Sequence, residues 1–341
     1  MGPFFRISKC GMLIIRSQYL GMKGYSMNMR MLICSALAFS ASVSTAKVAI
    51  SYDISTHQNK RPYQEDRFTH ALVRGGEFFG VYDGHGGDKT SSYLQQQLHG
   101  EFEDSLSYYI THEIGLPNPT EQHAFESAFR KAEKHVLDHY EDGSTAVVAY
   151  IDNNKLYCAW VGDSRLVLES NGTVAFATFD HKPERKDEKE RIEQAGGKIK
   201  FHGVWRVNGL AVSRSIGDKS CKSGSEGQIV ATPEYAQMQL NSDNHFMIIA
   251  SDGLWDVMSN EDAVKMVKEE LQKDNALKGT AQLLQKEAIK RGSRDNITVC
   301  VVSFGWSGGI TQAHTTDIKV NSLPNYAIRF WDWLFGTRSS D

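Results

Sequence analysis

The fold of this chain is decided by two stretches of sequence, Phe78-Phe79-Gly80-Val81-Tyr82-Asp83-Gly84 and Phe246-Met247-Ile248-Ile249-Ala250-Ser251-Asp252-Gly253. Each is a short apolar run that ends in Asp-Gly. Such a run is typical of a buried strand, and the glycine allows the backbone to turn sharply after it. The strand therefore delivers a carboxylate to its own end, where carboxylate oxygens can bind a hard cation. Because the pattern occurs twice, far apart in the sequence, we predict a metal site built from several strand ends.

Further strand-like runs and helical patterns surround these two stretches. The strand-like runs cover residues 48–52, 78–82, 145–151, 156–161, 165–169, 246–250 and 297–304. Between them, Phe125, Phe129, Ala132 and Val136 recur at three- and four-residue spacing, as on one face of a helix. Hairpins and helices are segregated along the chain rather than strictly alternating. We therefore expect an α+β fold with largely antiparallel sheets.

The amino-acid composition is that of a globular protein. The chain of 341 residues is 40% hydrophobic and 23% charged, as in a globular protein. Its net charge is −3, from 38 Lys and Arg against 41 Asp and Glu, so we expect no nucleic-acid partner. The 5 cysteines form no CxxC pair and are interpreted as buried thiols, neither a disulfide framework nor a set of zinc ligands. Since no internal repeat or linker is found, we predict one catalytic domain over 47–307.

The two ends of the chain differ from this domain. No acidic residue precedes Asp53, and an apolar stretch at 32–39 is followed by small residues at 44–46. This pattern suits a secretory signal, a mitochondrial presequence or, if the segment is a plain disordered tail, a cytoplasmic protein. We therefore exclude residues 1–46 from the fold. The tail over 308–341 holds an aromatic helical pattern that either docks on the domain or contacts a partner or membrane surface. Membrane contact is expected only through the termini.

Acidic residues at strand ends carry the predicted chemistry. Oxygen ligands select Mg²⁺ or Mn²⁺ over zinc, which prefers His and Cys. Two such ions about 3.5–4 Å apart would lower the pKa of a shared water and stabilise both ends of a displacement. Arg61 is suited to bind phosphate oxygens, and His85, directly after Asp83-Gly84, to protonate a leaving oxygen. The segments concerned are 61–66, 83–87, 162–165, 251–253 and 294–296.

Each of these segments alone is a common turn, but as an ordered set they resemble one family. That family is the metal-dependent Ser/Thr protein phosphatases of type 2C, and the resemblance runs from Val48 to Phe304. The motifs that carry it are Arg61…Glu65-Asp66-Arg67, Val81-Tyr82-Asp83-Gly84-His85-Gly86-Gly87, Asp142-Gly143-Ser144-Thr145-Ala146, Trp160-Val161-Gly162-Asp163-Ser164-Arg165, Asp180-His181-Lys182-Pro183, Arg206-Val207-Asn208-Gly209-Leu210-Ala211-Val212-Ser213-Arg214, Ala250-Ser251-Asp252-Gly253-Leu254-Trp255-Asp256 and Arg294-Asp295-Asn296-Ile297-Thr298-Val299.

The resemblance implies a set of metal ligands. Asp83 would bridge two Mg²⁺ or Mn²⁺ ions, and the Gly84 carbonyl would bind one of them. Asp252 and Asp295 would hold the other ion, and Asp163 with Asp252 a weaker third one.

The same resemblance implies roles for four further residues. Glu65 and Asp66 would accept hydrogen bonds from metal-bound waters. Arg61 would bind the phosphate, and His85 would act as the general acid. The implied fold is a four-layer α-β-β-α sandwich, with two central antiparallel sheets flanked by helices.

The expected activity is hydrolysis of phosphoserine and phosphothreonine in proteins, by direct attack of a metal-bridging hydroxide, in a monomer. An inactive scaffold that binds phosphoproteins is one alternative, although the three aspartates that such proteins lose (Asp83, Asp252 and Asp295) are all present. A hydrolase of small phosphoesters is the other, since the same site cleaves any accessible monoester.

One stretch departs from the family pattern. The turn between Gly209 and Leu210 is one residue short, beside a flap over 218–228 that helps to choose substrates. In this flap, Lys219 and Lys222 either meet acidic phosphopeptides or remain solvated. The preceding run, 184–191, is interpreted as a charged helix face.

Overall fold

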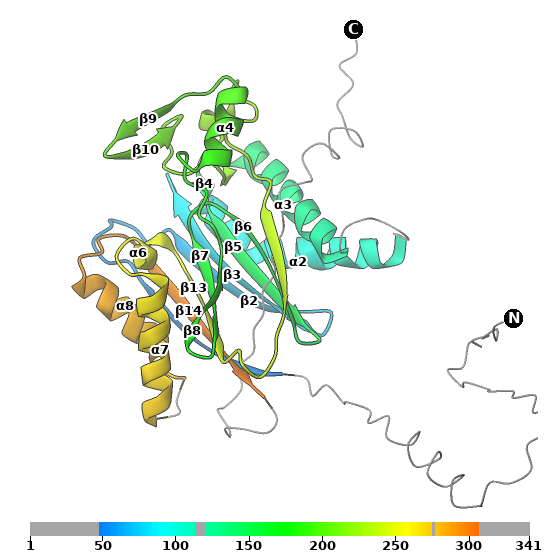
Figure 1. Cartoon of the computed structure of the whole chain (residues 1–341). Helices are drawn as coiled ribbons and strands as arrows, with labels where there is room; N and C mark the ends of the chain where they lie inside the picture. The colour runs from blue at the N-terminus through cyan, green and yellow to red at the C-terminus, as the bar shows by residue number, and fades with distance from the viewer. Residues whose placement is uncertain (1–47, 113–119, 275–276, 307–341) are drawn as a thin grey trace, which may run out of the picture. The chain divides into compact units, whose positions relative to one another are not determined.

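Two antiparallel sheets packed face to face form the centre of the molecule, and helices cover their outer faces (Figure 1). The computed structural model describes residues 48–112, 120–274 and 277–306. This architecture confirms the predicted α-β-β-α sandwich. The predictions for residues 1–46 and 308–341 lie outside the described residues, so the targeting segment and the aromatic tail stay predictions.

The larger sheet has the strand order β11-β4-β3-β5-β6-β12, and β2 also pairs with β3. Asn153 and Asn154 make the tight β5–β6 turn at positive φ, a conformation that asparagine tolerates. The strands are β2 (Asp66–Val73), β3 (Gly76–His85), β4 (Gly143–Ser144), β5 (Ala146–Asp152), β6 (Lys155–Val161), β11 (Ile216–Gly217) and β12 (Glu234–Gln239).

The smaller sheet has the order β1-β14-β13-β7-β8. All of its strand pairs are antiparallel, with β14 between β1 and β13. The strands are β1 (Ala49–His57), β7 (Arg165–Ser170), β8 (Thr173–Ala177), β13 (Phe246–Ala250) and β14 (Ile297–Gly305).

Helices pack on the outside of each sheet. The helices α2 and α3 share a core with the larger sheet, and α6, α7 and α8 share one with the smaller sheet. Among the described residues, no helix combines the length and apolar character needed to cross a membrane. The helices are α2 (Lys89–His112), α3 (Thr120–His139), α4 (Lys186–Gln194), α5 (Lys219–Lys222), α6 (Asp252–Trp255), α7 (Asn260–Asp274) and α8 (Thr280–Lys290).

Adjacent residues of one strand enter different cores. Phe78 lies in the core beneath α2 and α3, whereas Phe79 lies in the core between the sheets. In β14, Cys300 faces the other sheet, and Val299 and Val301 face the helices of the outer layer. Side chains alternate between the two faces of a strand, so a strand covered on both faces is apolar throughout. This explains why the defining runs show no polar alternation.

The short turn at Gly209 closes a small hairpin. Asn208 and Gly209 have φ of 48° and 94°, and Val207 and Leu210 exchange two backbone hydrogen bonds of 2.9 Å. Two central residues with positive φ are the signature of a tight two-residue turn, which favours Asn-Gly. The missing residue therefore tightens this turn. The adjoining pair of strands, β9 (Ile199–His202) and β10 (Val204–Val207), remains in register.

Candidate active site

The strand ends that carry the predicted site lie at one end of the sandwich. In the larger sheet, β3 ends at His85 and β2 begins at Asp66, which pairs with Asp83. In the smaller sheet, β13 ends at Ala250 and β14 begins at Ile297, so Asp252 and Asp295 flank neighbouring strand ends. Both sheets therefore contribute acidic residues to the same edge of the molecule.

The backbone of Asp83 is fixed on both sides. Its N–H donates to the Thr145 hydroxyl at 3.2 Å, and its carbonyl accepts from the Thr145 N–H at 2.9 Å and the Ser144 hydroxyl at 3.2 Å. A Cβ at Gly84 would lie 2.7 Å from the Glu65 carbonyl, so only glycine allows this approach. The Asp83 carboxylate therefore leaves a rigid strand end, as the sequence predicts.

Carboxylates gather around Asp83. Desolvation raises its pKa well above the usual range, and neighbouring negative charges raise it further. Desolvation and neighbouring carboxylates raise the pKa of Asp252 in the same way. Carboxylates have this effect on one another only at short range, so the structure brings residues from both sheets together. The charges that act on Asp83 belong to Asp252, Asp66, Asp163 and Asp295.

Asp66 is buried at the centre of this group, with an exposed fraction of 2%. Its Oδ2 accepts a hydrogen bond from the Ser251 hydroxyl at 2.8 Å. Its Oδ1 is buried and lacks a hydrogen-bond partner within the described part of the chain. Burial raises the pKa of Asp66 to about 6. A buried carboxylate oxygen without a partner is costly, so this position suits an acceptor for water on a bound cation.

The side chain of Asn296 holds the loop that precedes β2. Its amide donates to the carbonyls of Gln58 and Tyr63, both at 2.9 Å, and its Oδ1 accepts from the Glu65 N–H at 2.8 Å. Three bonds from one side chain fix the loop that carries Arg61. The sequence does not indicate this role of Asn296, whose only signal is its place directly after Asp295.

Arg61 and Asp295 form an ion pair at this loop. The guanidinium side chain is 49% exposed, so it lies at the rim of the acidic group. Burial works against the charge of Arg61, but Asp295 raises its pKa, with help from Asp83 and Asp252. Desolvation raises the pKa of Glu65 on the same loop. The predicted phosphate-binding arginine and the predicted metal ligand thus lie in direct contact.

Lys182 forms an ion pair with Asp163, the residue predicted to hold a third ion. Asp163 is buried between β6 and β7, with an exposed fraction of 4%. Burial opposes the ammonium form of Lys182, yet Asp163 raises its pKa. An ammonium group therefore neutralises part of the carboxylate cluster. The motif around Lys182 was recognised in the sequence, but its contact with Asp163 was not.

His85, the predicted general acid, lies at the end of β3 with its Nε2 2.9 Å from each carboxylate oxygen of Asp218. Burial lowers the pKa of His85, but Asp218 outweighs burial and the net shift is upward. Asp218 was expected only to open the flap. That flap is anchored, because Lys222 donates to Glu133 at 2.6 Å, which makes Lys222 unavailable to a phosphopeptide in this arrangement.

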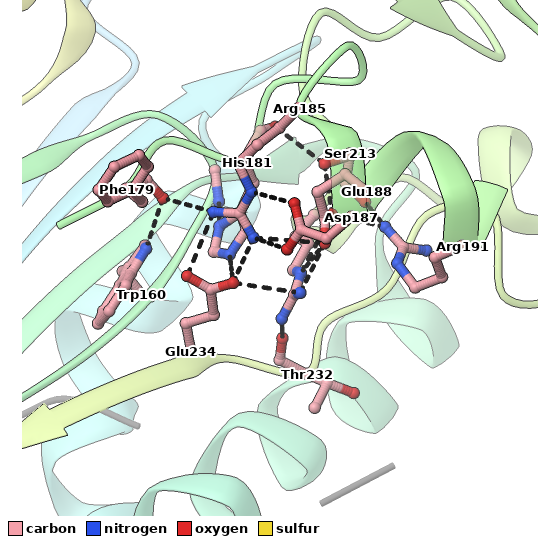
Figure 2. Close-up of polar contacts among 12 residues, drawn as sticks. Trp160, Phe179, His181, Arg185, Asp187, Glu188, Arg191, Ser213, Thr232 and Glu234 are labelled. Atoms are coloured by element: carbon pink, nitrogen blue, oxygen red, sulfur yellow. Dashed lines mark hydrogen bonds and ion pairs between the residues drawn. The ribbon is translucent and has the colours of Figure 1, made fainter. Parts of the chain in front are cut away.

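A second acidic cluster lies beside α4, where the carboxylates of Asp187, Glu188 and Glu234 come within 4.8 Å of one another (Figure 2). Arg185 pairs with Asp187 and Glu234, and Arg214 donates to Glu188 at 2.6 Å. Glu188 is only 1% exposed, so the prediction of a charged helix face is wrong for this residue. Its carboxylate instead pairs with the buried Arg214 and with the partly exposed Arg185 and Arg191.

The pKa values distinguish the two clusters. Burial opposes ionisation of Glu234, yet His181 and Arg185 lower its pKa to about 2. Arg214 lowers the pKa of Glu188 in the same way against burial. Positively charged and hydrogen-bonding partners thus already stabilise the charges of Glu234 and Glu188, whereas Asp83 and Asp252 have raised pKa values and call for further positive charge. The cluster at Asp83 fits a divalent metal site, and the cluster beside α4 does not.

The cluster beside α4 has a structural role in the site. His181 accepts a hydrogen bond from the Gly162 N–H at its Nδ1, at 3.1 Å, and its own N–H donates to the Gly162 carbonyl at 2.9 Å. Glu234 lies 3.5 Å from the other ring nitrogen of His181. These contacts therefore fix Gly162, which directly precedes Asp163, and His181, which directly precedes Lys182.

The comparisons with known proteins agree with this geometry. Residues 58–297 match the model of the protein phosphatase 2C family. The chain is 42% identical to "Probable protein phosphatase 2C 69" of Arabidopsis thaliana over 265 residues, which cover 74% of this chain and 70% of the relative. It is 40% identical to "Probable protein phosphatase 2C 52" of Oryza sativa subsp. japonica, but covers only 44% of that relative.

Solved structures share the fold. The crystal structure of serine-threonine phosphatase 2C from Toxoplasma gondii aligns with a TM-score of 0.65 and 26% identity, covering 76% of this chain and 96% of that one. A C. elegans sex-determining protein aligns with a TM-score of 0.64 and 25% identity, over 81% of this chain and 71% of that one. With the strand-end carboxylates in place, the chain belongs to the protein phosphatase 2C family.

Proposed function

We propose that this protein hydrolyses phosphoserine and phosphothreonine monoesters in protein substrates and depends on divalent cations. One observation carries the proposal: aspartates from both sheets meet at one edge, where desolvation and mutual repulsion raise their pKa values. Membership of the protein phosphatase 2C family supplies the reaction class and the phosphoprotein substrates.

The acidic residues are suited to hold the ions. Asp83, the Gly84 carbonyl, Asp252 and Asp295 would bind two Mg²⁺ or Mn²⁺ ions, and Asp163 a weaker third. When bound, the ions supply an activated water and offset the negative charge of the phosphate. Glu65 and the unpartnered oxygen of Asp66 would orient waters around them.

The remaining chemistry belongs to Arg61 and His85. Arg61 lies at the rim beside Asp295, where its guanidinium group can bind two phosphate oxygens at once. His85 follows Asp83 by two residues, so it would lie close enough to protonate the departing serine or threonine oxygen. Covalent catalysis by the chain is not required, because the attacking oxygen comes from water.

The test is phosphate release from a phosphothreonine peptide by the full chain, with Mn²⁺ or with EDTA. We expect turnover only with Mn²⁺ and a loss of at least about 100-fold in Asp252→Asn, given that even residues outside the ligand set cost 10–100-fold at metal sites. Asp187→Asn, in the arginine-paired cluster, is the matched control and should retain activity.

Three results would contradict the proposal. Turnover that persists in EDTA would remove the metal dependence. Turnover of small phosphoesters but of no phosphopeptide would favour the small-molecule hydrolase. Binding of Mn²⁺ and phosphopeptide with no phosphate released would favour the scaffold.

A further inference from the structure

We propose that Asp218 positions His85 for proton transfer to the leaving oxygen. This inference rests on the proposed role of His85 as general acid. The Nε2 of His85 lies 2.9 Å from Oδ1 and 2.9 Å from Oδ2 of Asp218, so the imidazole ring faces the carboxylate symmetrically. The two residues are 133 positions apart and come from different elements, β3 and the start of α5.

The carboxylate of Asp218 is itself held rigidly. It is 5% exposed, and its Oδ2 accepts a hydrogen bond from the Ser215 hydroxyl at 2.5 Å. The backbone N–H of Asp218 donates to the Asp142 carbonyl at 3.0 Å. A Cβ at Gly143 would lie 2.2 Å from the same Oδ2, so the absent side chain at Gly143 makes room for the carboxylate.

Asp218 also has an unusual backbone conformation. Its φ of 59° is left-handed, a region that costs most residues free energy and that aspartate tolerates better than most. The neighbouring chain is fixed from both sides by Glu133 of α3, which accepts from the Gly217 N–H at 2.7 Å and from Lys222 at 2.6 Å. The fold therefore holds a strained turn in which the Asp218 carboxylate faces His85.

This contact determines which nitrogen of His85 carries the transferable proton. Because Nε2 donates its hydrogen to Asp218, Nδ1 is the nitrogen left to face a substrate. As the phosphorus–oxygen bond breaks, its electron pair stays on the serine or threonine oxygen, which takes the proton from Nδ1. His85 then becomes neutral with its Nε2 proton retained, Asp218 remains a carboxylate, and solvent water returns a proton to Nδ1.

If Asp218 positions His85, its loss should affect substrates differently according to their leaving group, whereas loss of a purely structural residue should not. Loss of Asp218 should matter only when the leaving oxygen needs a proton. A serine or threonine oxygen needs one, whereas p-nitrophenolate departs readily without it. General acid catalysis contributes about 10²–10⁴-fold, so we expect roughly 10–100-fold from the residue that orients the acid.

The experiment compares two substrates on the Mn²⁺-loaded full chain. In Asp218→Asn, kcat on a phosphothreonine peptide should fall roughly 10–100-fold with little change in KM, while kcat on p-nitrophenyl phosphate stays within about twofold. His85→Gln should show the same selectivity with a larger loss. Asp142→Asn is the control: it alters a buried carboxylate on the adjoining turn and should change both rates by the same factor.

A second variant covers the case in which Asp218→Asn does not fold. Ser215→Ala keeps the carboxylate but removes the hydroxyl that fixes its Oδ2, so a smaller, selective loss on the peptide is expected. Equal losses on both substrates, or none on the peptide, would overturn the role of Asp218. If His85→Gln were also unselective, the assignment of His85 as general acid would be wrong. If the wild-type protein had no Mn²⁺-dependent turnover, the proposed function itself would fail.

Discussion

The hydroxyl of Ser251 donates a 2.8 Å hydrogen bond to the buried carboxylate of Asp66, and this bond joins the two sheets at the active-site edge. Asp66 begins β2 of the larger sheet, and Ser251 directly follows β13 of the smaller one. The same hydroxyl accepts from the Thr298 N–H of β14 at 3.0 Å. One small side chain therefore connects three strands from both halves of the sandwich.

We predict that Ser251→Ala lowers the free energy of unfolding by about 1–3 kcal/mol, because it leaves a buried acceptor and a buried N–H unsatisfied. Urea denaturation of the metal-free protein measures this change. Ser220→Ala, an exposed change in α5, is the control and should have almost no effect. Equal stability of the two variants would show that Ser251 does not connect the sheets energetically.

We expect Asp252→Asn to have opposite effects on the metal-free and the metal-loaded protein. Desolvation and neighbouring carboxylates raise the pKa of Asp252, so removing its charge relieves repulsion without metal. With Mn²⁺ the same change removes a proposed metal ligand. A ligand at 100 times its Kd stabilises a protein by about 2.7 kcal/mol, and this gain should shrink sharply.

Thermal unfolding in EDTA and in Mn²⁺ measures both effects of Asp252→Asn. The melting temperature in EDTA should equal or exceed that of the wild type, and the increase on adding Mn²⁺ should be smaller. A variant that melts lower in EDTA but keeps the full Mn²⁺ increase would refute the metal assignment.

Asp66 should make the metal-free protein less stable as the pH rises, which is the opposite of the usual effect of an aspartate. Its pKa is raised from 3.8 to about 6 on folding, so the folded state binds the proton more tightly than the unfolded state does. Its contribution is fully present below about pH 4 and is lost as the pH rises through 6. The loss is on the order of 2–3 kcal/mol, since one pKa unit corresponds to 1.36 kcal/mol.

Denaturation in EDTA between pH 4 and 7 isolates this effect by comparing the wild type with Asp66→Asn. The variant lacks the titrating group, so the difference in stability should shift in its favour as the pH rises. A difference that is constant across this range would contradict the raised pKa of Asp66.

The buried ion pair between Arg214 and Glu188 of α4 should be essential for stability. Arg214 and Glu188 are 2% and 1% exposed, so Arg214→Met would leave a buried carboxylate without its main partner. Removing one member of a buried ion pair typically costs about 3–5 kcal/mol. Lys189→Met, in an exposed pair with Glu193, is the control and should cost less than about 1 kcal/mol. Urea midpoints compare the two, and equal shifts would contradict the prediction.

The acidic part of the site was predictable because it follows from local pattern. Asp83 and Asp252 come at the ends of apolar runs. A strand that is covered on both faces must be apolar throughout, so such runs are easy to recognise. The fold class followed from the same runs. The pairing of Asp66 with Asp83, however, depends on the register between β2 and β3, which the local sequence does not determine.

The residues that orient the site were not predictable, because each acts across a long sequence separation. Asp218 contacts His85 from 133 positions away, and Lys182 reaches Asp163 only because His181 holds the backbone at Gly162. Glu188 is the clearest example of a residue whose position could not be predicted from the sequence. A charged run normally faces solvent, but distant residues such as Arg214 and Ser213 bind this carboxylate in the interior.

Because the carboxylates come from two different sheets, the core between those sheets would set the distances between the proposed ion ligands. Phe79 and Val147 from one sheet meet Met247 and Cys300 from the other in that core. A cavity in this apolar core would let the strand ends move apart and would weaken the proposed ion binding. If the proposed ion site is correct, substitutions at Met247 in this core should change cation affinity although Met247 contacts no proposed ligand.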